Sequence, residues 1–268
     1  MPSTSPGQAP PSTPSDFAQI LPGAPTPSLQ GLTTFHYRHK HYVAYISGRQ
    51  LNVLASPTKL VQAIIFKEPL VALASDSLTG KLAVAGKSEV YILEPVTEGW
   101  TKIWWEKALS LRREDAGDEA RCMGWGNEGE LLVGGSHQLT LFSTLPSSRT
   151  SSPVASRVEG EAAEERKPLW SKHVASPVQY AAFSPSASLI ATCGVYDRLV
   201  KIWRRLSFEE GLFDYSYLPH PGTVTHLEWR PPSEHSDERR GSGISGRQDE
   251  DPEMLFTLAN DGLSLIHI

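Results

Sequence analysis

The chain of 268 residues repeats one pattern of short apolar segments separated by turn residues. In the clearest copy, an apolar run over 178–185 is followed by 188–192 and then by 197–203. The same order recurs over 122–142 and over 70–93, and another copy opens at 224–229 and continues over 254–259. Short apolar runs bounded by Gly, Pro, Ser and Asp are typical of β-strands, so the full pattern predicts three strands joined by two turns.

Aromatic residues that end the first segment of each copy give the repeat length. Trp125 and Phe183 lie 58 residues apart, and Phe183 and Trp229 lie 46 apart. Removing a polar insertion of roughly twenty residues from the first interval leaves about 38, close to the roughly 40–45 residues of a four-stranded propeller blade. The sequence therefore predicts an all-β fold, a β-propeller.

Three polar segments interrupt the pattern. Residues 1–28 are rich in Pro, Ser and Thr, and the segments 146–168 and 231–253 are similarly poor in apolar residues. Such segments bury too little apolar surface to offset their ordering entropy, so we expect a disordered tail (1–28) and two disordered insertions within a propeller over 29–268. The segment 231–253 carries seven acidic residues and three arginines, and thus most of the formal net charge of −5. This balance argues against nucleic acid as a partner.

The sequence carries few targeting signals. Cys122 and Cys193 both lie inside apolar runs, which is typical of reduced core cysteines. No run approaches eighteen apolar residues, and the Pro-rich start does not resemble a signal peptide. We therefore expect a cytoplasmic chain with no transmembrane segment.

The run Ala-Thr-Cys-Gly-Val-Tyr-Asp-Arg-Leu-Val-Lys-Ile-Trp over 191–203 resembles the end of a WD repeat. In that family a His, a Ser or Thr, a turn Asp and a Trp form a buried hydrogen-bond network. The resemblance implies this network for His173, Thr192, Asp197 and Trp203, with His220 as the first member of the next repeat. The other copies lack the full set.

Several residue patterns also permit a chemical interpretation. His173, Thr192 and Asp197 have the residue types of a base, a nucleophile and an orienting acid, but catalysis requires an exposed hydroxyl beside an oxyanion hole. The glycine pattern over 124–129 spells a dinucleotide fingerprint, and that over 80–88 nearly spells a phosphate loop, yet strands rather than helices are expected after both. We therefore expect turns at both places, and no catalytic residue or cofactor.

Two aromatic-rich clusters have alternative interpretations. His36, His39 and His41 invite a metal or phosphate site, and strand alternation would place His39 and His41 on one face. Zinc sites usually need three or four protein ligands, so a solvated strand start is favoured and no metal site is expected. The tryptophans at 100, 104 and 105 are expected to pack on a blade edge, the alternative being a peptide-binding surface.

A closer resemblance covers most of residues 20–230. The segments 20–25, 42–54, 196–203 and 217–224 are similar to the amino-terminal WD-repeat region of the large scaffold subunit of the RAVE complex, the DmX-like or rabconnectin family. The resemblance implies a non-catalytic scaffold that promotes assembly of the vacuolar proton-translocating ATPase, and hence vacuolar acidification.

The same resemblance implies the partners and the location. The partners would be subunits of the pump's peripheral sector, the smaller RAVE subunit and a Skp-type adaptor. The scaffold would be cytoplasmic and peripheral to vacuolar and endosomal membranes. The Pro- and Ser-rich insertions are typical of a filamentous-fungal version. Two alternatives stay open: a WD-repeat scaffold in vesicle trafficking or ubiquitin-ligase substrate recognition, and a propeller hydrolase.

The end of the chain departs from the repeat. After Gly262 the pattern demands alternating residues that close on a Trp, but Ser264 and His267 stand at the expected apolar and Trp positions. We therefore expect a truncated sequence, or a last segment 263–268 that is foreign to the gene. Without the tail and insertions, about 195 residues suffice for four to five blades, whereas a WD-repeat ring usually has about seven. The sequence thus predicts an incomplete propeller, a fragment of a larger ring.

Overall fold

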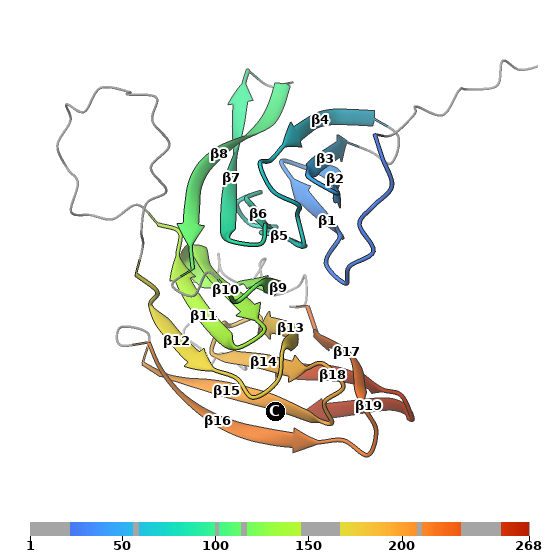
Figure 1. Cartoon of the computed structure of the whole chain (residues 1–268), viewed down its shortest axis with the longest axis vertical. Coiled ribbons are helices and arrows are strands. Elements are labelled where there is room, and N and C mark those ends of the chain that lie inside the picture. Colours follow the sequence, from blue (N-terminus) through green and yellow to red (C-terminus); the bar gives the residue numbers. More distant parts are fainter. Residues whose placement is uncertain are drawn as a thin grey trace, which may run out of the picture.

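The chain folds into five consecutive antiparallel sheets, which Figure 1 shows arranged around an open arc. The computed structural model describes residues 22–55, 59–99, 102–113, 117–145, 167–207, 211–231 and 253–267. The tail expected over 1–28 and the insertions expected over 146–168 and 231–253 lie mostly outside these residues. The all-β, incomplete propeller predicted from the repeat is confirmed.

Each sheet takes its strands from one stretch of the chain, in sequence order from the inside of the arc outward. The first sheet contains β1 (Leu32–Tyr37), β2 (Lys40–Ser47), β3 (Gln50–Ala55) and β4 (Lys59–Ile65). The second contains β5 (Ala72–Ser75), β6 (Leu82–Ala85), β7 (Glu89–Glu98) and β8 (Lys102–Arg112). The third contains β9 (Ala120–Trp125), β10 (Glu130–Gly135), β11 (Gln138–Ser143) and β12 (Trp170–His173). The fourth contains β13 (Val178–Phe183), β14 (Leu189–Gly194), β15 (Leu199–Ser207) and β16 (Leu212–Pro219). In the described residues the fifth contains β17 (Val224–Trp229), β18 (Met254–Ala259) and β19 (Gly262–His267).

These five sheets are blades A to E, and the core lies between them. Four buried apolar clusters are present among the described residues, and each draws its side chains from two consecutive blades. The cluster between blades C and D, for example, joins Leu139 and Leu141 of β11 to Ile190 of β14 and Trp203 of β15. Because burial of apolar surface drives folding, each blade is stabilised chiefly by its neighbours.

The aromatic residues that set the repeat length also connect the blades. The indole Nε1 of Trp125, at the end of β9, donates to the carbonyl of Ala74 in β5 at 3.2 Å. Trp229, at the end of β17, donates in the same way to Ala182 in β13 at 3.1 Å. Each indole therefore joins the innermost strand of its blade to the innermost strand of the preceding blade.

The residues just before β1 lie along the inner side of the arc. The Gln30 amide donates to the carbonyl of Met123 at 2.8 Å and accepts from the Met123 N–H at 2.7 Å. Met123 lies in β9, which pairs with β10 alone. Gln30 therefore satisfies two backbone groups on the unpaired edge of that strand. The Thr26 N–H is hydrogen bonded to Ile46 of β2, so the described part of the expected tail packs on blade A.

The ambiguous segments of the sequence form strands and turns. The residues from Trp105 to Arg112 lie in β8. The glycine-rich run over 124–129 leads through a 3₁₀ turn (Asn127–Gly129) into β10, so the strand expected after the dinucleotide-like pattern is present. Of the expected tryptophan cluster, Trp105 is buried between blades A and B and Trp104 is partly exposed, whereas Trp100 lies outside the described residues.

Burial of the two cysteines leads to a test of the fold. Cys122 and Cys193 are both buried and free, and burial raises the pKa of each thiol to about 12. Because the thiolate is the reactive form, we expect neither residue to react with a maleimide at pH 8 in the native protein. Both should react when the chain is unfolded in urea, as mass spectrometry would show. Labelling of either cysteine at the rate of a free thiol under native conditions would contradict the described packing.

Candidate protein-interaction site

Two of the residues expected in the WD network meet in the core of blade D. The Trp203 indole, 1% exposed, donates to the Thr192 hydroxyl at 2.9 Å. Asp197 lies in the turn between β14 and β15, where its carboxylate accepts from the backbone N–H groups of Arg198 and Leu199. His173 is exposed at the end of β12, opposite Gln138, and no hydrogen bond in the described chain joins it to Thr192 or Asp197.

The second histidine of the expected set is buried between blades D and E. The Nδ1 atom of His220 lies 3.1 Å from the carbonyl oxygen of Leu218, and Nε2 lies 2.8 Å from the Thr257 hydroxyl. Because a carbonyl only accepts, Nδ1 carries the proton and Nε2 accepts from Thr257 in the neutral ring. His220 thus connects the end of β16 to β18 of the next blade.

Carboxylates take the corresponding place in two other blades, where the sequence suggested no network. Glu68 lies between β4 and β5, and accepts from the N–H groups of Ser88 and Glu89 at the turn between β6 and β7. Asp118 lies between β8 and β9, pairs with Arg113, and accepts from the His137 N–H at 2.7 Å. The sequence signal that could have revealed these two carboxylates is an acidic residue placed shortly before the first apolar segment of a repeat copy.

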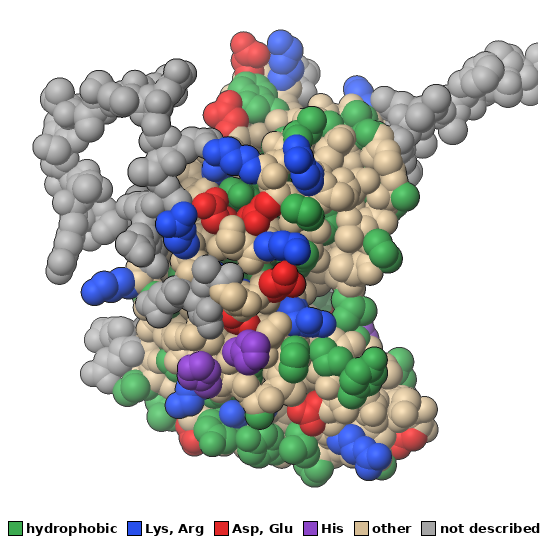
Figure 2. All heavy atoms as spheres, in the orientation of Figure 1, with side chains coloured by type: hydrophobic (Ala, Val, Ile, Leu, Met, Phe, Trp, Pro, Cys, Tyr) green, Lys and Arg blue, Asp and Glu red, His purple; other side chains and the backbone are tan. Residues whose placement is uncertain are grey.

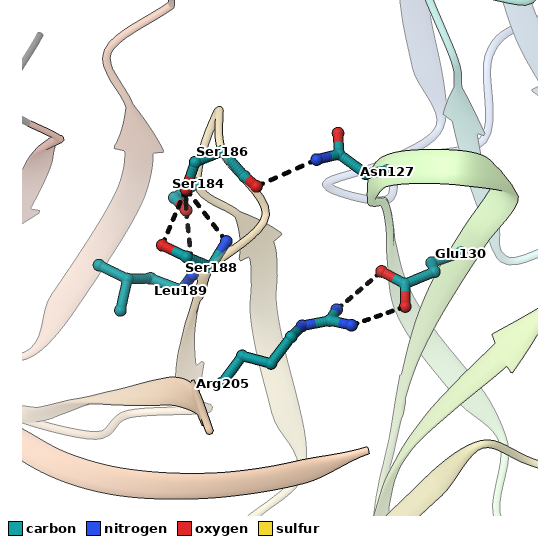
Figure 3. Close-up of polar contacts among 7 residues, drawn as sticks. All are labelled: Asn127, Glu130, Ser184, Ser186, Ser188, Leu189 and Arg205. Carbon is teal, nitrogen blue, oxygen red and sulfur yellow. Dashed lines mark hydrogen bonds and ion pairs between the residues drawn. The ribbon is translucent and has the colours of Figure 1, made fainter. Parts of the chain in front are cut away.

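A buried ion pair joins blades C and D. Figure 3 shows the Arg205 guanidinium from β15 aimed at the Glu130 carboxylate of β10, with two hydrogen bonds of 2.8 and 2.7 Å. The Arg205 side chain is 1% exposed and that of Glu130 is 14% exposed. Beside the pair, the Asn127 amide donates to the carbonyl of Ser186 at 3.0 Å. The two blades are therefore connected by polar contacts as well as by their apolar cluster.

A cavity of about 250 Å³ opens where the turns between the first two strands of blades B, C and D converge. Trp125 and Phe183 supply apolar lining, whereas Asn127 and Ser184 supply polar groups. Leu78, on the turn after β5, is 88% exposed at this cavity. The lining combines apolar rings with several polar groups, which suits an anchoring side chain of another protein, so this turn cavity is the candidate interaction site.

The structure changes the interpretation of the histidines near the start of the propeller. Arg38 and His39 form the turn of the β1–β2 hairpin with positive φ, and His36 pairs with His41 across it. The expectation that His39 and His41 share one strand face is wrong, because the turn interrupts strand alternation. The Nε2 atoms of His36 and His41 are 2.7 Å apart. Within the residues that the structure describes, no three His, Cys, Asp or Glu side chains are placed to hold a metal.

Solved structures with the same architecture define the class of protein. The chain superposes on the WD40 domain of Toxoplasma gondii coronin with a TM-score of 0.55 and 12% identity, over 87% of this chain and 54% of that one. Saccharomyces cerevisiae Sqt1 superposes with a TM-score of 0.58 and 9% identity, over 88% of this chain and 58% of that one. At this identity the likeness concerns the fold, and the chain is a WD-repeat β-propeller protein.

Two curated relatives give a more particular likeness. The chain is 24% identical over 213 residues to Regulator of V-ATPase in vacuolar membrane protein 1 of Saccharomyces cerevisiae, covering 79% of this chain and 14% of that protein. It is also 24% identical over 244 residues to human DmX-like protein 1, covering 81% of this chain and 8% of that protein. These matches confirm the resemblance drawn from the sequence motifs. The chain spans only a small part of each relative's length. No protein-family model matches the chain.

The ion pair between blades C and D provides a stability test. Replacing Arg205 by Met leaves the Glu130 carboxylate largely buried without its partner, which costs about 3 kcal/mol or more. We expect urea unfolding of R205M to show that loss in the free energy of unfolding. The double variant R205M/E130Q should regain much of it, because no unpaired charge remains. A single variant as stable as the parent chain would show that the pair does not hold the blades together.

Proposed function

We propose that this chain is part of a non-catalytic scaffold that promotes assembly of the vacuolar proton-translocating ATPase, acting within a RAVE-type complex. The observation that carries the proposal is the likeness to Regulator of V-ATPase in vacuolar membrane protein 1 over 79% of the chain. The likeness to DmX-like protein 1 extends over nearly the same share of the chain. The proposed partners are subunits of the pump's peripheral sector, a smaller RAVE subunit and a Skp-type adaptor.

The propeller suits such a role because it holds many turns in fixed positions. Each blade is packed against the next, so the turns around the cavity keep their relative places. The residues that resembled a catalytic set have structural contacts instead: the Thr192 hydroxyl is buried and accepts from Trp203. A buried hydroxyl engaged in this way is not available as a nucleophile, which supports a scaffold rather than a hydrolase.

The location follows from the same likeness. The yeast relative is named for a vacuolar membrane, and we propose a peripheral association of this chain with vacuolar and endosomal membranes from the cytoplasmic side. The described residues include no helix long and apolar enough to cross a membrane.

The proposed function predicts a defect in vacuolar acidification. In the organism that carries this gene, deleting it should raise vacuolar pH and reduce the share of the pump's peripheral sector that sediments with vacuolar membranes. A ratiometric pH dye and immunoblots of membrane fractions measure the two effects, and re-expression of the full-length gene is the control. Normal vacuolar pH in the deletant would refute the proposal, and capture of coat or cullin components without pump subunits would favour a different scaffold role.

A substitution at the turn cavity should impair function without affecting folding. Leu78 is 88% exposed, so L78D should leave the melting temperature unchanged while it places a charge at the cavity. We expect the full-length protein with L78D to recover less of the membrane-bound peripheral sector than wild type in the deletant. The matched control is I65D, because Ile65 is 71% exposed on β4 of blade A and does not line the cavity. Full recovery with L78D would exclude this cavity as the contact site.

A further inference from the structure

A cluster of aromatic rings surrounds one lysine on the outer part of blade D. The strand register places Lys201 opposite Tyr217 and Trp203 opposite Tyr215, so all four side chains lie on one face of β15 and β16. The Lys201 ammonium lies 3.9 Å from the centre of the Trp203 ring, 3.7 Å from that of Tyr215 and 5.5 Å from that of Tyr217. Aromatic faces attract cations, so the ammonium is held at a fixed place.

Blade C contributes the opposite wall. The Trp170 ring from β12 packs edge-on against Trp203 with ring centres 5.0 Å apart. Lys172 lies two residues further along β12 and therefore on the same face as Trp170. The strand β12 has four residues and β16 has eight, and Tyr215 and Tyr217 remain 47% and 51% exposed. We call Trp170, Lys172, Lys201, Trp203, Tyr215 and Tyr217 the lysine–aromatic patch.

The patch has positive charge that no acid of the described chain balances. Neither Lys172 nor Lys201 forms an ion pair with a described carboxylate. Asp214 is close in sequence, but it pairs with Arg204, which alternation places on the other face of the same two strands. Burial lowers the pKa of the Lys201 ammonium, and the charge of Lys172 lowers it further. An anion placed beside both lysines would relieve this repulsion.

The surroundings of the lysines indicate what kind of anion fits. Hydrophobic side chains gather along the lower rim in Figure 2, where Figure 1 places β16. Leu212, Tyr215 and Tyr217 of β16 are all exposed. Exposed tyrosines beside a cation suit a peptide that carries both carboxylates and apolar side chains. A phosphate-rich polymer or an anionic membrane would instead need a broad basic surface, and the chain has a formal net charge of −5.

We propose that the lysine–aromatic patch is a docking site for an acidic segment of a partner protein. In this arrangement a carboxylate of the segment lies beside the ammonium groups of Lys172 and Lys201, and its apolar side chains cover the rings of Tyr215 and Tyr217. The patch lies on the outer strands of blades C and D, whereas the turn cavity lies at turns that follow their innermost strands. A segment on the patch can therefore bind together with a partner at the cavity, whichever assembly the chain serves.

The test selects peptides from a random twelve-residue phage library on the purified chain, in parallel on the parent and on K172Q/K201Q. The matched control is K40Q/K59Q, which removes the same charge from exposed positions of blade A. We expect peptides that bind the parent and the control but not K172Q/K201Q, and we expect Asp or Glu next to apolar residues to be enriched among them. A selection that yields no lysine-dependent peptides, or yields peptides without acidic enrichment, would overturn the proposal.

Affinity measurements on a selected peptide complete the test. Fluorescence anisotropy should show binding at least about tenfold weaker to K201Q than to the parent, because the variant loses a hydrogen bond between two charged groups. K201R should retain most of the binding, because the cation remains. Replacing the peptide's acids by their amides should abolish the difference between parent and K201Q.

Lysine-dependent binding of phosphatidylserine vesicles or of oligouridine, in place of acidic peptides, would also overturn the proposal. Unchanged melting temperatures exclude unfolding as the cause, and the outcome does not depend on the vacuolar role.

Discussion

Burial of each sheet against the next is the constraint on which the rest of this structure depends. A four-stranded antiparallel sheet has two faces, and here each apolar cluster is shared by two consecutive blades. Trp125 and Trp229 reinforce this packing by donating to the innermost strand of the preceding blade. The ion pair of Arg205 and Glu130 also reinforces the packing of blade D against blade C. The turn cavity and the lysine–aromatic patch both exist because neighbouring blades hold fixed positions.

The repeat pattern predicted the fold because its signal is local. Apolar runs and turn residues lie within single copies, Trp125, Phe183 and Trp229 mark the same place in three copies, and each copy forms one sheet. The Thr192–Trp203 hydrogen bond also lies within one copy, and a short sequence motif indicated it.

The contacts between copies were the part that the sequence did not indicate. Within single blades the sequence also did not indicate Glu68 and Asp118, which accept from backbone N–H groups at turns, because a carboxylate does not match the family's histidine. Arg205 and Glu130 are 75 residues apart in the sequence. The lysine–aromatic patch combines β12 of blade C with β15 and β16 of blade D. The pairing of His36 with His41 depended on a tight turn that strand alternation alone does not predict. Long-range geometry, rather than residue type, decides the contacts between blades C and D.

Native-state hydrogen exchange tests the central claim, that consecutive blades are stabilised as one unit. Amides in β10 of blade C and in β14 of blade D lie on strands that are paired on both sides, where local fraying is least expected. If the blades depend on each other, these amides open with the same free energy, and low concentrations of denaturant lower both values in parallel. Exchange of β14 through an opening in which β10 stays fully protected would contradict the account, because blade D would then unfold without its neighbour.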